Sequence, residues 1–262
     1  MGGALEEPGN ITPLAEFNIA ADSFAAARVF ALTSPIPAST MPPKPPIPEH
    51  ESNSDHAKRL LDLPDYPPLS QLGDARLNIV LFPLDCTSRL EVFRHEYLSR
   101  TRKLRDQGSP LAEWHDAIMR HCFHTMENLH LNHSDDTTHV VLHDAVCIWY
   151  ALHASSHPNH NYAASDIQQK SKKQGETEWT LSSPIDIRIE SAGQWSRGAC
   201  IVDKRDRKMR TESREDAEAL GPIKSDDGAW LSDKRGNRVR VCNGTPGRKA
   251  FAKILWKTIF NL

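Results

Sequence analysis

Residues 138–152 read THVVLHDAVCIWYAL and connect a predicted strand to a predicted helix through a histidine and an aspartate. The apolar run from Thr138 to Leu142 has the length of a strand buried on both faces. The stretch from His143 to Leu152 is predicted to be the helix that follows it. In open α/β sheets ligands bind outside the carboxyl ends of the strands, so His143 and Asp144 fall where a site is expected.

These two side chains are of types that act in catalysis and ligand binding. A histidine gives or takes a proton near neutral pH, and an aspartate offers oxygens to a hard cation or a sugar hydroxyl. The alternative is structural: Asp144 caps the helix and His143 is an ordinary loop residue. Without further context, these residues favour the structural interpretation.

Other segments repeat the alternation of strands and helices. We expect an α/β fold with a mainly parallel sheet flanked by helices. A capping-box pattern at 88–91 predicts a helix to about Arg105, and Ser109-Pro110 predicts the start of another. That second helix has an apolar stripe of Leu111, Trp114, Ile118, Cys122 and Leu129. The further expected elements are a strand at 77–82, a helix at 24–32 capped by Asp22, paired strands at 186–190 and 199–202, and a closing helix with Phe251, Ile254, Leu255 and Ile259 on one face.

We expect one domain over residues 1–262, interrupted by polar insertions. Ten of the eighteen prolines lie between Ser34 and Pro68, which predicts an extended, unpacked insertion at about 34–72. A ligand for a proline-reading domain is the alternative there. Two charged loops are expected at about 159–180 and 204–240.

Composition excludes several classes of protein. The formal net charge of −2 argues against nucleic-acid binding. No apolar run approaches the ~20 residues of a membrane span, and no signal peptide is evident. Five dispersed cysteines without a CxxC pair are typical of reduced thiols, so we expect a cytoplasmic protein.

A second polar segment, Gly9 to Asn18, reads GNITPLAEFN. Two amides and one carboxylate on a short, turn-rich stretch are suited to a polyhydroxylated ligand. A plain polar loop is the alternative, and it is the one the segment favours when taken alone.

Four blocks in order resemble the inosine/uridine-preferring nucleoside hydrolase family. They cover the chain apart from its insertions, and together they are far more specific than any one of them. The blocks are MGGA (1–4) with PGNITP (8–13), AEFN (15–18) and AD (21–22); PLDCT (83–87); HDA (143–145); and GQWSRG (193–198) with Val202-Asp203.

The resemblance implies hydrolysis of the N-glycosidic bond of purine and pyrimidine ribonucleosides, as in nucleoside catabolism and purine salvage. By their positions in the motifs, Asn10, Glu16 and Asn18 match residues that hydrogen-bond the ribose. His143 matches the residue proposed to protonate the departing base. Asp144 matches a calcium ligand that also faces the ribose. A ribose with oxocarbenium character needs fixed polar groups, and a poor leaving group needs a proton.

The sequence departs from the family in one respect. The Asp-x-Asp-x-x-x-Asp-Asp motif, which the family uses for its general base and most calcium ligands, has no counterpart among the 262 residues. Asp135-Asp136 and Asp226-Asp227 do not match its spacing. We therefore expect an N-terminally truncated member that neither binds Ca²⁺ nor turns over nucleosides alone, because calcium takes roughly six to eight oxygens. The alternative is a short product or pseudoenzyme that acts as a binding or interaction protein.

Two further possibilities stay open. His121 and His124 lie three residues apart on a predicted helix and form a candidate metal pair, without the Cys or Glu partners of a zinc site. A partial sheet exposes an edge and apolar surface, which favours association, so a homo-oligomer is an open alternative.

Overall fold

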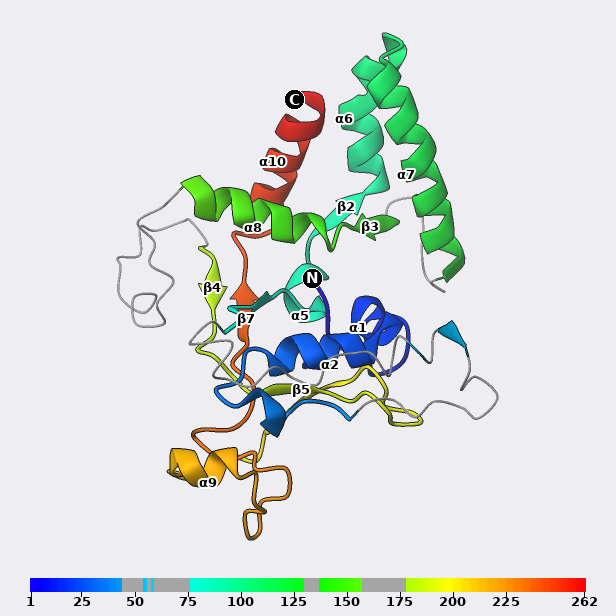
Figure 1. The fold of residues 1–262 in the computed structure, drawn as a ribbon. Coiled ribbons are helices and arrows are strands. Elements are labelled where there is room, and N and C mark those ends of the chain that lie inside the picture. Colours follow the sequence, from blue (N-terminus) through cyan, green and yellow to red (C-terminus); the bar gives the residue numbers. More distant parts are fainter. Residues whose placement is uncertain (44–53, 56–57, 59–75, 130–136, 157–177) are drawn as a thin grey trace. The chain divides into compact units, whose positions relative to one another are not determined.

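The computed structural model describes residues 1–43, 54–55, 58, 76–129, 137–156 and 178–262. Within these ranges the helices are α1 (Phe17–Ala21), α2 (Ser23–Ala31), the 3-10 turn η1 (Pro37–Ser39), α5 (Leu84–Thr87), α6 (Arg94–Asp106), α7 (Pro110–Leu129), α8 (Ala145–Ser156), α9 (Arg214–Glu218) and α10 (Arg248–Phe260). The strands are β1 (Val80–Leu81), β2 (Glu91–Phe93), β3 (His139–Val141), β4 (Thr180–Leu181), β5 (Ile187–Ile189), β6 (Cys200–Val202) and β7 (Arg240–Gly244) (Figure 1).

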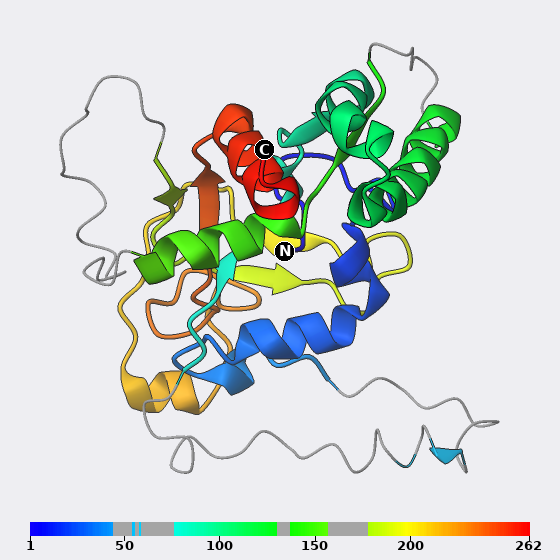
Figure 2. The same cartoon turned by 90° about the horizontal axis from the view of Figure 1, so that it is seen from above.

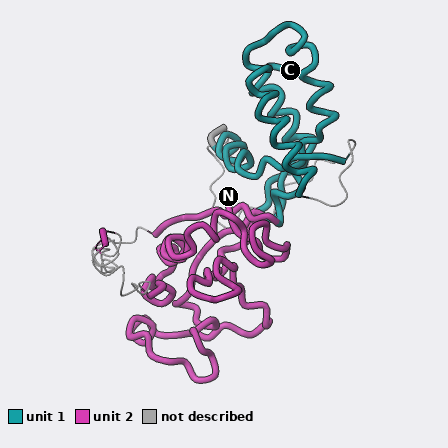
Figure 3. The backbone as a smooth tube through the Cα atoms, turned by 90° about the vertical axis from the view of Figure 1, so that its right-hand side faces the viewer, with its two compact units in different colours: residues 1, 85–180, 243–262 teal, residues 2–84, 181–242 magenta. Residues whose placement is uncertain are grey.

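The chain divides into two compact units (Figure 3). Unit 1 holds Met1, residues 85–180 and residues 243–262. Unit 2 holds residues 2–84 and 181–242. Along the described chain, no helix combines the length and apolar character that crossing a bilayer requires.

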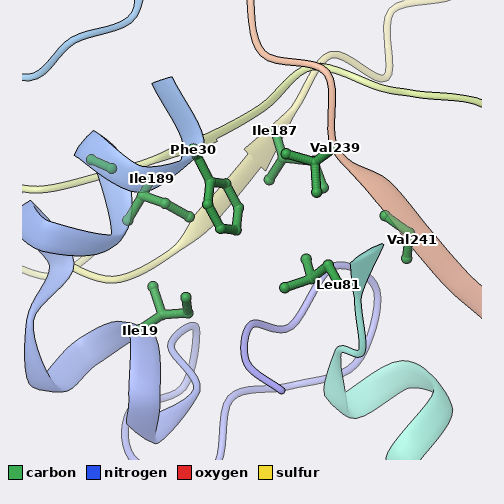
Figure 4. Packing of buried hydrophobic residues seen from close by; sticks show 8 residues of the cluster. Ile19, Phe30, Leu81, Ile187, Ile189, Val239 and Val241 are labelled. Carbon is green, nitrogen blue, oxygen red and sulfur yellow. The ribbon is translucent and has the colours of Figure 1, made fainter. Parts of the chain in front are cut away.

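Unit 2 is a small α/β layer in which α2 covers β5 (Figure 2). The predicted helix at 24–32 and its cap are confirmed, since the Ala25 N–H donates to Asp22 Oδ1 at 2.8 Å. The predicted strand pair is also confirmed as antiparallel β5 and β6. Figure 4 shows the core of this unit, in which helix residues meet strand residues: Ile19, Ala27, Phe30, Leu81, Ile187, Ile189, Val239 and Val241.

Unit 1 is mostly helical, with α6, α7 and α10 packed against the short antiparallel pair β2 and β3, which α6 and α7 separate in the chain. Its core is aromatic and aliphatic, and α10 contributes one face of residues four apart in the sequence to it. The members of that core are Val92, Tyr97, Met119, Phe123, Ala252, Trp256 and Phe260.

The α/β class expected from the sequence holds, but the described strands do not form one mainly parallel sheet. They lie in three small sheets, in which β1 pairs with β7 in parallel while β2–β3 and β5–β6 are antiparallel. The described strands have two to five residues. Antiparallel neighbours need only short connections, which the 193–198 turn between β5 and β6 illustrates.

The capping box at 88–91 is wrong as a helix start. Glu91 pairs with Val141 as the first residue of β2, and α6 begins at Arg94 instead. Leu90, which directly precedes β2, is buried. Pairing with β3, a tertiary interaction, therefore overrides the local capping pattern.

The proline-rich insertion is packed where it begins, contrary to expectation. Ile36 is buried, and the Thr40 hydroxyl donates to Asn237 Oδ1 at 2.6 Å. Most of the remaining insertion, and most of the polar stretch at 159–180, lies outside the described residues.

The charged stretch at 204–240 is also more ordered than a polar loop. It contains α9 and closes around Arg235, whose Nε donates to Glu212 Oε2 at 3.1 Å and whose Nη1 donates to the Gly221 carbonyl at 2.9 Å. Arg235 is only 6% exposed, so this ion pair is buried within unit 2.

Candidate functional site

The loop before α1 closes tightly on itself in unit 2. The Gly9 N–H donates to the Pro13 carbonyl at 3.1 Å, and the Ala15 N–H donates to Thr12 Oγ1 at 2.9 Å. A Cβ at Gly9 would lie 2.3 Å from the Ala15 carbonyl oxygen. Only glycine fits there, and the closed loop brings Asn10 back to the start of α1.

Glu16 is the N-cap of α1 and is 1% exposed. Its carboxylate accepts three backbone N–H groups, from Gly3 (3.0 Å), Asn18 (2.9 Å) and Ile19 (3.1 Å). A carboxylate has about four lone-pair sites, so most of its accepting capacity is used inside the protein. Glu16 thus fixes the MGGA segment to the first turn of α1.

Asn10 and Asn18 are exposed at the same helix start. Asn10 Oδ1 accepts the Phe17 N–H at 2.8 Å, which holds the side chain and directs its NH₂ donors away from that bond. The structure therefore brings the three amino-terminal candidates, Asn10, Glu16 and Asn18, together at one end of α1.

His143 and Asp144 lie in unit 1, between the end of β3 and the start of α8. His143 is half-buried, and its Nδ1 lies 2.7 Å from the hydroxyl of Thr87. Thr87 itself is fully buried at the end of α5. This hydrogen bond holds Nδ1 of the ring against the hydroxyl, which can donate to Nδ1 or accept a proton from it, and leaves Nε2 as the other ring nitrogen.

Asp144 is exposed, and its carbonyl accepts the Cys147 N–H at 3.1 Å. It supplies one carboxylate at the start of α8. Among the described residues, no group of three or more His, Cys, Asp or Glu side chains is arranged to hold a metal ion. Calcium takes several oxygens at once, and of the candidate residues Asp144 is the one that matches a calcium ligand.

The other sequence candidates do not form metal clusters in the described part of unit 1 or unit 2. His124 Nε2 contacts Asn128 Nδ2 at 3.2 Å on the exposed face of α7. Asp226 is buried and accepts the Leu231 N–H at 2.9 Å. Asp135 and Asp136 lie outside the described residues.

Sequence reasoning missed Thr87. In the sequence the PLDCT block is only a family signature, and nothing in the spacing of Thr87 and His143 indicates that they meet. The available signal was the type of residue: a hydroxyl at the end of a short apolar run, followed by a turn. The contact joins residues 56 positions apart, so only the tertiary structure shows it.

Comparison with known proteins identifies the family of this chain. A family model described as inosine-uridine preferring nucleoside hydrolase matches residues 1–245. No curated protein matches the chain. Because that model spans nearly all of the sequence, the chain belongs to the inosine-uridine preferring nucleoside hydrolase family.

Proposed function

We propose that this chain provides the sugar-binding and base-protonating parts of a nucleoside N-ribohydrolase, which cleaves purine or pyrimidine ribonucleosides into base and ribose. Family membership supports nucleoside hydrolase function in general. The substrate is a ribonucleoside, and the role would lie in nucleoside catabolism or purine salvage in the cytoplasm.

The observation behind this proposal is the hydrogen bond between Thr87 and His143. To act as a general acid, the His143 ring must carry a proton on both nitrogens, with Nδ1–H donating to the Thr87 hydroxyl oxygen. The imidazolium then gives its Nε2 proton to the departing base, which is a poor leaving group as an anion, and is left as the neutral ring. A buried hydroxyl holding the ring reduces the cost of orienting the acid.

The amino-terminal residues take complementary roles in the proposal. The exposed amides of Asn10 and Asn18 hydrogen-bond ribose hydroxyls. Glu16 uses three acceptor positions to hold the helix start and offers its remaining capacity to the sugar. By its match to the family motif, Asp144 supplies a further carboxylate acceptor for the ribose.

The family resemblance assigns the activation of water to bound calcium, which lowers the pKa of that water. Asp144 is the one residue of this sequence that matches a calcium ligand. We therefore propose that the 262-residue chain alone neither holds calcium tightly nor hydrolyses nucleosides. Catalysis would need the carboxylates that the family motif supplies.

The test is an assay of the purified chain with inosine and with uridine, with and without calcium, following hypoxanthine and uracil release. We expect no release above the level of a His143→Ala variant purified in parallel. Calcium-dependent release that this variant loses would overturn the proposal of an inactive chain and would establish the role of His143.

A second candidate function is a binding protein that holds nucleosides without cleaving them. The exposed amides of Asn10 and Asn18 favour it. Saturation-transfer NMR with inosine separates the cases: binding that Asn10→Ala weakens, with no base released over hours, supports it. Absence of binding eliminates it.

A further inference from the structure

Unit 1 contains an open cavity of about 510 Å³ that has no part in the proposed nucleoside chemistry. Its volume falls in the range of small-molecule sites. The residues lining it come from the end of β2, the first two turns of α6 and the start of α10: Phe93, His95, Glu96, Ser99, Arg100 and Arg248.

Two guanidinium groups dominate the charge of this cavity. Arg100 Nε donates to Glu96 Oε1 at 3.2 Å, and Arg248 Nη2 donates to Glu96 Oε2. Glu96 is thus a single carboxylate between two arginines, and the lining keeps a net positive charge. The first turns of α6 and α10 add a partial positive charge in the same place.

The arginines also have aromatic and backbone partners that hold them in position. Arg248 lies over the Phe93 ring at 4.7 Å and donates from Nε to the Glu91 carbonyl at 2.9 Å. Arg100 lies over Trp256 at 5.7 Å. These bonds occupy one of the five N–H groups of Arg100 and two of the five of Arg248, so both forks keep donors for a further acceptor.

We propose that this cavity binds a phosphate monoester of a small metabolite. Two planar guanidinium forks and the Ser99 hydroxyl match the oxygens of a phosphate dianion. The volume leaves room for an attached sugar or nucleoside. Glu96 is the resident counter-ion that the phosphate displaces from the guanidinium groups. The site is independent of His143 and of the ribose-binding residues.

The experiment is calorimetric titration of the whole chain at physiological salt with inorganic phosphate, ribose 5-phosphate and uridine 5′-monophosphate. Equal affinity for all three indicates that the phosphate alone is recognised. Tighter binding of ribose 5-phosphate or of uridine 5′-monophosphate shows that the sugar or the nucleoside attached to the phosphate is recognised as well. No binding of any probe overturns the proposal.

Three variants make the test specific. Arg100→Gln should weaken binding about tenfold, because it removes a charged donor. Arg102→Gln is the matched control, since Arg102 lies on the same helix, is 80% exposed and does not line the cavity. It should change affinity by no more than about threefold.

Glu96→Gln separates a phosphate site from an Arg–Glu cluster that only stabilises the fold. Removing the competing negative charge should tighten binding about threefold or more. Equal losses in Arg100→Gln and Arg102→Gln, or weaker binding in Glu96→Gln, would show nonspecific attraction and refute the site. Circular dichroism melts of each variant confirm that the comparison concerns folded protein.

Discussion

At the scale of single residues, Glu16 shows how one side chain combines structure with a proposed role. A buried carboxylate that accepts three backbone N–H groups has more effect on local folding than an exposed polar residue in a loop. The same bonds place Asn10 and Asn18 at one helix end, so the ribose-binding hypothesis depends on this cap.

Glu16→Ala should lower the free energy of unfolding by about 2–3 kcal/mol, because the N–H groups of Gly3, Asn18 and Ile19 lose their acceptor. Glu16→Gln keeps one acceptor oxygen and should cost about 1 kcal/mol. Urea unfolding followed by circular dichroism measures both. Glu113→Ala, on the exposed side of α7, is the control and should stay within about 0.5 kcal/mol of the unmodified chain. A loss no larger than this control in Glu16→Ala would contradict the cap.

Thr87→Val should release the imidazole of His143, since the methyl group that replaces the hydroxyl cannot hydrogen-bond Nδ1. We expect the ring ¹⁵N shifts of His143 to move from one dominant tautomer toward a mixture, and Thr87→Ser to restore the original shifts. His124, exposed on α7, is the reference and should not change. Unchanged His143 shifts in Thr87→Val would show that the hydrogen bond does not determine the tautomer.

At the scale of elements, α7 shows the limit of reading a face from apolar spacing. The predicted apolar stripe lies on one side of the helix, but that side is not the buried one: Leu111, Trp114, Ile118 and Leu129 are 44–67% exposed. The buried face is formed by Ala112, Asp116, Met119 and Phe123. The helix has apolar residues on two sides, and contact with α6 and β3 decides which side is buried.

A pair of substitutions on α7 tests this assignment. Phe123→Ala should destabilise the chain by about 3–5 kcal/mol, because it leaves a cavity among Tyr97, Met119 and Trp256. Trp114→Gln should cost about 0.5 kcal/mol or less, since the indole is 64% exposed. Thermal melts of the two variants provide the comparison. A larger loss in Trp114→Gln would mean that this face is covered in solution.

At the scale of the whole molecule, stability should depend on pH through His115, which packs in unit 1 against the rings of Tyr97 and Phe260. Burial lowers the pKa of His115 below its usual value near 6.5, and nearby Asp116 offsets part of that shift. The unfolded chain then binds a proton more readily than the folded one. This contribution is fully present above the unfolded pKa and is lost as the pH falls toward the folded pKa.

Urea midpoints at pH 5.5 and 7.5 should therefore differ more for the unmodified chain than for His115→Gln, with the lower stability at pH 5.5. His121→Gln, exposed on the same helix, is the control and should leave the pH dependence unchanged. An equal pH dependence in the unmodified chain and in His115→Gln would contradict a depressed pKa.

The sequence by itself determined the family, the α/β class and the local elements with strong signals. The Asp22 cap, the β5–β6 pair, and the presence of helices α7, α8 and α10 follow from capping, turn and periodicity rules that act within about a dozen residues. The buried face of α10 does not, because it is formed by Phe251, Ala252, Trp256 and Phe260 instead of the predicted Phe251, Ile254, Leu255 and Ile259. The four ordered blocks identified the family that the comparison confirms over residues 1–245.

The tertiary structure alone decided which faces are buried, where α6 begins, and that Thr87 holds His143. It also decided that Arg235 and Glu212 form a buried ion pair, where the sequence predicts a charged loop exposed to solvent. Each of these outcomes depends on a partner from a distant part of the chain, and the gain from burying apolar surface or satisfying a buried polar group exceeds local preference. Local rules cannot contain that information, because the partner is absent from the segment to which they apply.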